Sequence, residues 1–251
     1  MRTLCFLFVC ALALSACAED DSTPDKGDLL VQWQSASTAD LQPMADWLYA
    51  SGLTEMIASD FNQKQVLPKD LPIILTECGT ENAFYDPSTP AVFMCYEIVA
   101  LAYRTFLGIS GITDQRASLA TMNTYIFILF HELGHAFVDY YDLPITGREE
   151  DAVDDYSALL LVNAGMGDSA VDAAAFWALI AQDPSAASFA NEHSLSQQRF
   201  YNILCIVYGS DPVTYASLVP DALPADRAVR CPSEYEQKNT SWTTLTAPWK
   251  K

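Results

Sequence analysis

Positively charged residues are scarce in this chain. It has 13 Lys and Arg against 32 Asp and Glu among 251 residues, which gives a formal net charge of −19 at pH 7. A surface this acidic repels phosphate backbones and anionic lipid head groups, which excludes nucleic-acid binding as the expected function. We expect the excess acid to serve solubility, and a preference for basic substrates is the alternative that composition alone does not decide.

Other sequence signals are missing as well. The chain has no internal repeat, no low-complexity segment and no C-x-x-C pair, which excludes repeat architectures and a cysteine-based zinc site. Hydrophobic residues make up 51% of the chain and charged residues 18%, so it can bury a core and does not fit disorder or a coiled coil. A length of 251 residues fits one ordinary domain or two small ones.

The apolar run at the N-terminus, Leu4 to Leu14, is too short to span a bilayer as a permanent helix. Arg2 precedes this run and small residues follow it. A basic start, a short apolar centre and small residues after it are typical of an export signal.

Two cleavage sites are compatible with this signal. The sequence LSAC, which ends at Cys17, resembles the lipobox of bacterial lipoproteins, in which the cysteine is lipidated and becomes the first residue. This interpretation predicts a signal peptide over residues 1–16, a polar tether over 17–28 and a lipoprotein of the outer membrane that faces the periplasm. Cleavage at the A-x-A site formed by Ala16 and Ala18 would remove Cys17 and leave a secreted soluble protein.

Either cleavage leaves four cysteines: Cys78, Cys95, Cys205 and Cys231. An even number in an exported chain predicts disulfides, and four cysteines allow three pairings. We favour the pairing of neighbours in sequence, because each pair then brackets a short excursion of chain. The predicted bridges are Cys78–Cys95 and Cys205–Cys231, with free buried thiols as the alternative.

Short apolar segments in the first part of the chain predict strands. Leu29–Trp33 predicts a strand that opens the domain, and Leu71–Cys78, which is short, apolar and β-branched, predicts a buried strand. Residues 82–97 predict a hairpin whose turn is the stretch 86–90. Apolar residues at helical spacing lie between the first two strands, and Pro43 favours a helix start close to it.

The pattern after the hairpin is helical. The helices end at Gly, Pro and Asp-rich joints, and a turn-rich tail begins at Asp211. These patterns predict an α+β fold in one domain over residues 29–251, with a small antiparallel or mixed sheet at the front and a mostly helical remainder. The predicted helices are 96–108, 115–140, 148–164, 168–182 and 194–208.

Two of the three histidines lie four residues apart, in the sequence HELGH. His131, Glu132 and His135 form the motif H-E-x-x-H, and residues i and i+4 of an α-helix project from one face. Two neutral imidazoles at this spacing can bind one Zn²⁺, and Glu132 can act as general base on a metal-bound water without ligating the metal. The preceding segment, 124–130, is apolar on nearly every face, which predicts a buried helix. Gly134 predicts close approach of another element, since glycine costs a helix about 1 kcal/mol.

The predicted helix after this one begins with an acidic turn, which suits its positive end. The layout resembles that of the gluzincin metallopeptidases, the thermolysin-like group, in which H-E-x-x-H is followed on the next helix by E-x-x-x-D. Glu150 and Asp154 match that spacing, so the resemblance implies that Glu150 is the third metal ligand and that Asp154 supports a ligand histidine. Glu149 is the competitor, but Val153 stands four residues after it and cannot replace the aspartate. A solvated acidic helix start is the structural alternative.

A second resemblance covers most of the exported chain. Residues 77–97, 130–155 and 193–212 together resemble a bacterial family of predicted metallopeptidases that has no assigned physiological role. The resemblance implies one zincin-like domain that runs from about Leu29 to the C-terminus, with the H-E-x-x-H helix at its active site.

Zincins often carry a His, Tyr or Arg that donates a hydrogen bond to the oxyanion opposite the metal. His193, Arg199 and Tyr201 are candidates, because they lie on or just before one predicted helix. A helix cap or a buried hydrogen-bonded residue is an alternative role for His193. A third role is that of metal ligand in place of Glu150.

Thermolysin-like enzymes also hold peptide substrates along an edge strand above the metal. By this resemblance Ala91–Tyr96 is a candidate for that strand, and a Cys78–Cys95 bridge would stiffen it. An ordinary structural strand is the alternative.

Together these features predict a zinc-dependent metallopeptidase of the bacterial cell envelope that acts on a peptide or protein substrate. Its rival is a non-catalytic binding or assembly lipoprotein of the envelope, on the same fold, with a structural metal. Glu132 argues against the rival, because a purely structural site has no use for a carboxylate beside the water. A structural zinc is also usually held by four protein ligands, and the sequence offers three good ones.

Overall fold

The strands in the first part of the chain form a mixed sheet. The computed structural model describes residues 25–181 and 196–251, and the order of the strands is β1-β2-β4-β3. β1 (Leu29–Trp33), β2 (Leu71–Thr76) and β4 (Ala91–Cys95) are parallel, whereas β3 (Ala83–Asp86) is antiparallel to β4. The predicted strands, the hairpin and the α+β class are therefore confirmed.

β4 lies inside the sheet, between β2 and β3. The interpretation of Ala91–Tyr96 as an edge strand is therefore wrong, and Tyr96 already belongs to the next helix. The physical reason is that β4 is almost wholly apolar and buried, as is typical of a central strand, with Val92 and Met94 at most 1% exposed. The edge strands are β1 and β3, and Phe84 of β3 is 36% exposed.

Two helices connect β1 to β2: α1 (Gln42–Ser51) and α2 (Leu53–Lys64). Pro43 lies in the first turn of α1, as predicted, because the N–H that proline lacks would have no helical partner there. Gly52 separates the two helices with a φ of 62°, a left-handed conformation that favours glycine. α2 packs against β1, and α1 packs against α3.

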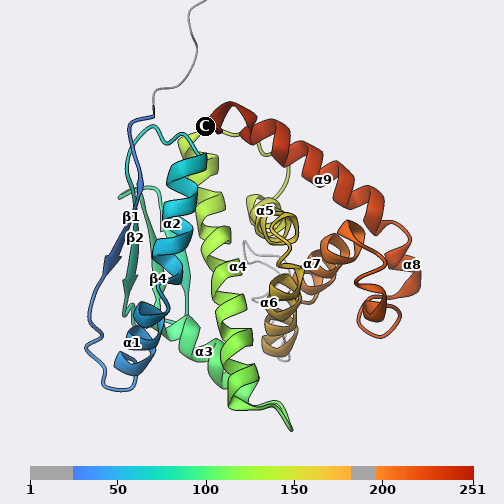
Figure 1. Cartoon of the computed structure of the whole chain (residues 1–251), viewed down its shortest axis with the longest axis horizontal. Helices are drawn as coiled ribbons and strands as arrows, with labels where there is room; N and C mark the ends of the chain where they lie inside the picture. Colours follow the sequence, from blue (N-terminus) through green and yellow to red (C-terminus); the bar gives the residue numbers. More distant parts are fainter. Residues whose placement is uncertain (1–24, 182–195) are drawn as a thin grey trace, which may run out of the picture.

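The helices predicted after the hairpin are present, with ends that differ by about two residues from the prediction within the described chain. Figure 1 shows α4 between two layers: the sheet and α2 lie on one side of it, and α5, α6 and α7 lie on the other. In the described residues no helix is both long and apolar enough to cross a bilayer. The five helices are α3 (Tyr96–Leu107), α4 (Asp114–Tyr140), α5 (Glu149–Asn163), α6 (Gly167–Ile180) and α7 (Ser196–Ser210).

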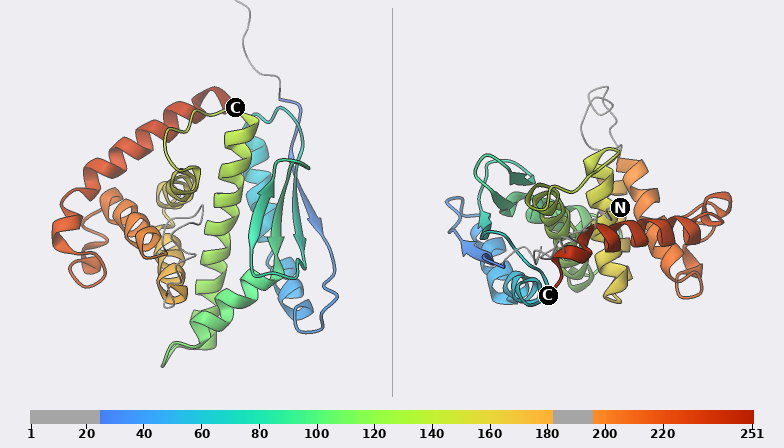
Figure 2. Two further views of the ribbon diagram at one scale, coloured as in Figure 1. Left: turned by 180° about the vertical axis from the view of Figure 1, so that it is seen from behind. Right: turned by 90° about the horizontal axis from the view of Figure 1, so that it is seen from above.

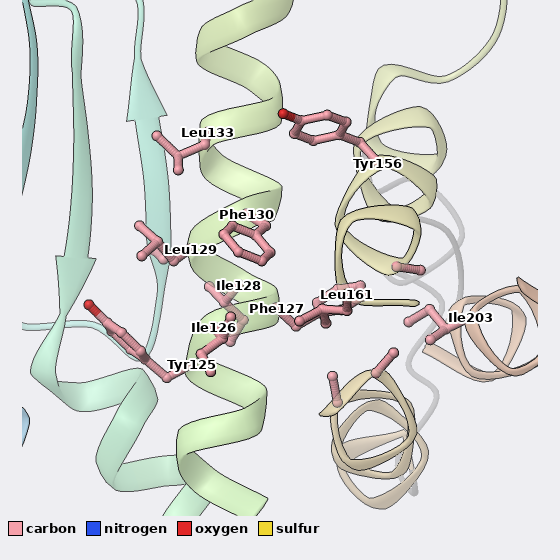
Figure 3. Packing of buried hydrophobic residues seen from close by; sticks show 14 of the residues in the cluster. Tyr125, Ile126, Phe127, Ile128, Leu129, Phe130, Leu133, Tyr156, Leu161 and Ile203 are labelled. Atoms are coloured by element: carbon pink, nitrogen blue, oxygen red, sulfur yellow. The ribbon is translucent and has the colours of Figure 1, made fainter. Parts of the chain in front are cut away.

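α4 is the central element of the core, because both layers pack on it. Its N-terminus is capped by Thr113, and the segment 124–130 is buried on all sides, as predicted. Figure 3 shows Leu129 on the side of the strands and Phe127 directed toward Leu161 of α5. All three side chains are 0% exposed, so the first of the two metal-motif helices is held rigidly by apolar contacts from both sides.

The tail contains a helix that the sequence did not predict, α9 (Cys231–Thr246), preceded by the short α8 (Ala225–Ala228). The sequence of α9 is polar and shows little apolar periodicity, so it lacks the usual signal of a surface helix. Tertiary contacts hold it instead. Trp242 is 7% exposed and packs on Tyr156 of α5, with ring centroids 4.6 Å apart.

Both predicted disulfides are present. Cys78–Cys95 joins the segment after β2 to β4, with 5.5 Å between the Cα atoms, and Cys205–Cys231 joins α7 to α9, with 4.9 Å. Such bridges stabilise a fold by about 2–4 kcal/mol, chiefly by restricting the unfolded chain. The second bridge thus fixes α9 to a helix that α5 and α6 also contact.

Candidate metal centre

Both motif histidines project from one face of α4. The Nε2 atoms of His131 and His135 are 3.3 Å apart, and the two ring planes stand at 80° to one another. The side chain of His131 is 4% exposed and that of His135 is 15% exposed. The pair therefore lies where the core meets the surface, with two potential ligand atoms brought to one point by the helical repeat.

Gly134 allows α5 to approach this face of α4. A Cβ atom at this position would lie 2.9 Å from Cβ of Val153 and 3.3 Å from a ring carbon of Tyr156. A separation below 3.0 Å is closer than van der Waals contact permits, so a larger residue would push the helices apart. The structure thus supplies the close approach that the sequence predicted from this glycine.

Glu150, in the first turn of α5, reaches both imidazoles. Its Oε2 lies 3.1 Å from Nε2 of His131, and its Oε1 lies 3.5 Å from Nε2 of His135. Ligand atoms held 2.0–2.2 Å from a tetrahedral Zn²⁺ are about 3.3–3.6 Å from one another. Two imidazole nitrogens and one carboxylate at this spacing could hold a metal ion and match the distances expected for zinc. The structure brings the three predicted ligands together.

Asp154 lies one turn further along α5, on the far side of the His131 ring. Its Oδ1 accepts a hydrogen bond from Nδ1 of His131 at 2.8 Å, which directs Nε2 toward the ligand group. Burial by itself lowers the pKa of His131, but the hydrogen bonds with Asp154 and Glu150 outweigh it and raise that pKa to about 9. Burial also opposes ionisation of Asp154, yet Arg199 and His131 hold the pKa of this carboxyl well below its usual range. Asp154 is therefore an anion.

Glu149 has a role that the sequence did not predict. Its Oε1 lies 2.7 Å from Nδ1 of His135, so it supports the second imidazole as Asp154 supports the first. Burial lowers the pKa of His135, whereas Glu150 and Glu149 raise it, and the net shift is upward. The sequence indicates Glu149 only as a rival metal ligand. Its position directly before Glu150 is the one signal in the sequence that could have indicated this role.

Glu132 follows His131 in α4 and is 6% exposed. Its negative charge is one of the causes that raise the pKa of both His131 and His135, so the carboxylate is close to the two imidazoles. The group of converging ligand atoms consists of the two histidines and Glu150, without Glu132. Glu132 is thus a buried carboxylate whose charge acts on both imidazoles and which is not part of the converging group.

The candidates for an oxyanion donor have different positions. His193 lies outside the described residues. Arg199 is 5% exposed, and its guanidinium is engaged by Asp154 instead of facing a substrate. Tyr201 is 37% exposed and lines a cleft of about 500 Å³ together with Asp151, the residue after Glu150. Among the described candidates, only Tyr201 lies on an open surface beside the first turn of α5.

Comparison with known proteins identifies a family for this chain. The sequence profile of a family described as "Putative metallopeptidase" matches residues 33–246, which is most of the chain and includes both histidines, Glu132 and Glu150. Comparison with curated proteins and with solved structures gave no match. A metallopeptidase family implies a metal ion, and the two imidazoles with Glu150 are a group that could hold it. The chain belongs to the DUF4344 family of "putative metallopeptidases".

Proposed function

We propose that this protein is a zinc-dependent peptidase that hydrolyses peptide bonds in the bacterial cell envelope. Membership of the family supports the peptidase class. The observation that carries the zinc assignment is the convergence of ligand atoms from His131, His135 and Glu150 within 4.8 Å of one another. The buried Glu132 beside them supports catalysis over a purely structural role.

Each side chain of the centre has a distinct task in this mechanism. A bound zinc ion would supply a lowered pKa for a reactant water and polarisation of the scissile carbonyl. Glu132 accepts the proton of the attacking water and later passes it to the leaving amine. Asp154 and Glu149 accept hydrogen bonds from the Nδ1 atoms of the two imidazoles, which keeps both Nε2 lone pairs directed at the ligand position.

We propose β3 as the strand that holds an extended peptide substrate, in place of β4. β3 pairs with β4 on one side, and within the described chain no strand pairs with its other side. β3 also lies beside α4 (Figure 2), and the hydroxyl of Tyr85 donates a hydrogen bond to Asp139, one turn after His135. A peptide paired with the free edge would therefore run close to the metal centre.

We also propose that the domain is attached to the outer membrane by a lipid on Cys17 and faces the periplasm. The signal peptide, Cys17 and most of the tether lie outside the described residues, so the support is the sequence LSAC and the export signal. The two disulfides fit an oxidising compartment. Metabolic labelling with a radioactive fatty acid should label the wild type and not Cys17→Ser. Unlabelled wild type in the medium would support secretion of a soluble protein instead.

The variant Glu132→Gln tests the catalytic assignment. It removes the proton acceptor and keeps the three ligands, so the purified variant should contain as much zinc as the wild type and fail to cleave a broad peptide library. The wild type treated with a chelator should also fail to cleave. Cleavage by the variant at the wild-type rate would show that the general base is another residue. Zinc in the wild type without cleavage of any peptide would favour a binding or assembly lipoprotein.

A further inference from the structure

Four side chains from four helices form a continuous series of contacts behind His131. Asp154 of α5 accepts from Nδ1 of His131 at 2.8 Å. Arg199 of α7 donates to the same carboxylate, from Nε to Oδ2 at 2.7 Å and from Nη2 to Oδ1 at 2.6 Å. The guanidinium carbon of Arg199 lies 3.7 Å from the centre of the Trp177 ring on α6. The imidazole is thus connected to every helix of the layer that faces it.

The contacts of Arg199 determine how Asp154 can be oriented. Oδ1 of Asp154 is shared between Arg199 and His131, and Oδ2 is held by the second donor of Arg199. Rotation of the carboxylate away from the imidazole would therefore break a charge-assisted hydrogen bond at the other oxygen. Asp154 is 4% exposed and Arg199 5%, so water is poorly placed to replace either bond.

The aromatic ring of Trp177 lies against the guanidinium of Arg199. A planar guanidinium stacks on an aromatic face, which a lysine ammonium cannot do in the same way. The Nε1 atom of Trp177 is buried and has no hydrogen-bond partner in the described part of the chain. Trp177 thus buries an N–H group that has no hydrogen-bond partner among the described residues, and the face of its ring contacts Arg199.

We propose that Arg199 is a positioning residue for the metal ligand His131, that it acts through Asp154, and that Trp177 keeps its guanidinium in place. The inference rests on the proposed metal centre. It makes zinc affinity dependent on one residue of α7 and one residue of α6, although neither helix contributes one of the three ligands. Supporting residues behind a ligand typically change metal affinity by about 10–100-fold when they are lost.

The chain contains a matched control for this effect. Arg116 of α4 donates to both carboxylate oxygens of Asp172 on α6, and the side chain of Asp172 is 8% exposed. This pair resembles the one between Arg199 and Asp154 in its two donors and its buried carboxylate. It lies 15 residues before His131 on α4, which is about 22 Å along a helix. Loss of Arg116 should therefore lower stability without a change in zinc affinity.

The experiment measures zinc affinity by competition with a chromophoric chelator, and the thermal unfolding of the metal-free protein, for the wild type and single variants. Arg199→Met should lower zinc affinity about 10–100-fold. Arg199→Lys keeps the positive charge but loses the planar group that donates to both carboxylate oxygens, and it should lower the affinity less. Trp177→Leu should also weaken binding, by a smaller factor. Arg116→Met should bind zinc with the affinity of the wild type, even if its unfolding temperature falls as much as that of Arg199→Met.

A double variant separates positioning from general stability. Because Arg199 is proposed to act through Asp154, Arg199→Met should cost little further zinc affinity in an Asp154→Asn background. Independent, additive losses would overturn the inference, and so would wild-type affinity in both Arg199 variants. An equal loss of affinity in Arg116→Met would also overturn it, because the effect would then be one of stability. A wild type that binds no zinc would instead overturn the proposed function on which the inference rests.

Discussion

Gly134 of α4 and Val153 of α5 are in closer contact than any larger residue would allow, since a Cβ atom on Gly134 would lie 2.9 Å from Cβ of Val153. The variant Gly134→Ala gains about 1 kcal/mol of helix propensity. Overpacking of a buried contact typically costs about 1–3 kcal/mol, so we expect a net loss of stability. The separation of the helices should also move Glu150 away from the histidines and weaken zinc binding.

Thermal unfolding and chelator competition would measure the two effects in Gly134→Ala. Gly147→Ala is a suitable control, because no described atom lies within 4 Å of the Cβ position there, and this glycine is in the loop between α4 and α5. Zinc affinity at the wild-type level in Gly134→Ala would show that the approach of the two helices does not set the position of Glu150.

The pairing of Glu149 with His135 predicts an effect that differs between two substitutions. Glu149→Ala removes the acceptor at Nδ1 and should lower zinc affinity by about tenfold, the low end for such support, because this side chain is 46% exposed. Glu149→Gln keeps an acceptor oxygen and should lose less. Chelator competition measures both, and Glu236→Ala on the exposed face of α9 controls for the change in net charge. Equal affinity in Glu149→Ala and the wild type would exclude this role.

The local elements were predictable because each has its own short-range signal. The apolar segment 124–130, the H-E-x-x-H spacing and the acidic start of the next helix are all visible in sequence. Gly134 was informative for the same reason, since a glycine inside a good helix needs an explanation and Val153 supplies it. The two disulfides followed from short separations along the chain, 17 and 26 residues.

The features that were not predicted depend on contacts between distant segments. β3 instead of β4 is an edge strand because β4 pairs with both β2 and β3, and strand order is not encoded in any one strand. α9 has a polar sequence and is held through Trp242 and a disulfide. The sequence indicates Arg199 as a candidate oxyanion donor, and its position 45 residues after Asp154 gives no sign that the two side chains pair.

The raised pKa of His131 predicts how zinc binding depends on pH. This imidazole has a pKa of about 9 without metal, and a metal ligand must be deprotonated. Zinc must therefore displace a proton below about pH 9, and the pKa of His135 is raised as well. Apparent affinity should thus rise by at least about tenfold per pH unit from neutral pH and level off above 9. Chelator competition over this range measures the slope, and a flat profile would contradict a raised pKa of His131 in the metal-free protein.

The same pKa predicts the stability of the metal-free protein. A histidine whose folded pKa is raised above about 6.5 stabilises the fold fully below that value, and the contribution disappears as pH rises through the folded pKa. The free energy of unfolding of the metal-free protein should therefore decrease between about pH 6.5 and 9. Asp154→Asn removes the strongest partner of the imidazolium and should flatten this decrease. Urea unfolding at several pH values, with chelator present, tests both statements.

The ion pair between Asp155 and Lys238 connects α5 to α9 and predicts a further loss of stability with rising pH, in a lower pH range. Burial raises the pKa of Asp155 to about 6, although Lys238, with its Nζ 2.6 Å from Oδ1, acts to lower it. For a carboxyl with a raised pKa, ionisation costs stability, so this group destabilises the fold as pH rises from about 4 through 6. Without the lysine, the ionised carboxylate would lose this cation, and the cost of its ionisation would increase.

Lys238→Met should therefore destabilise the protein more at about pH 7.5, where Asp155 is ionised, than at about pH 5, where it is protonated. We expect a loss of about 1–3 kcal/mol at the higher pH, below the usual cost of breaking a fully buried pair, because the two side chains are 16% and 28% exposed. Lys64→Met is the control, since its pair with Asp60 is a surface pair with both side chains more than half exposed. Urea unfolding measures each variant at both pH values. Equal losses for Lys238→Met at the two pH values would mean that Lys238 holds α9 by packing of its alkyl chain and not by its charge.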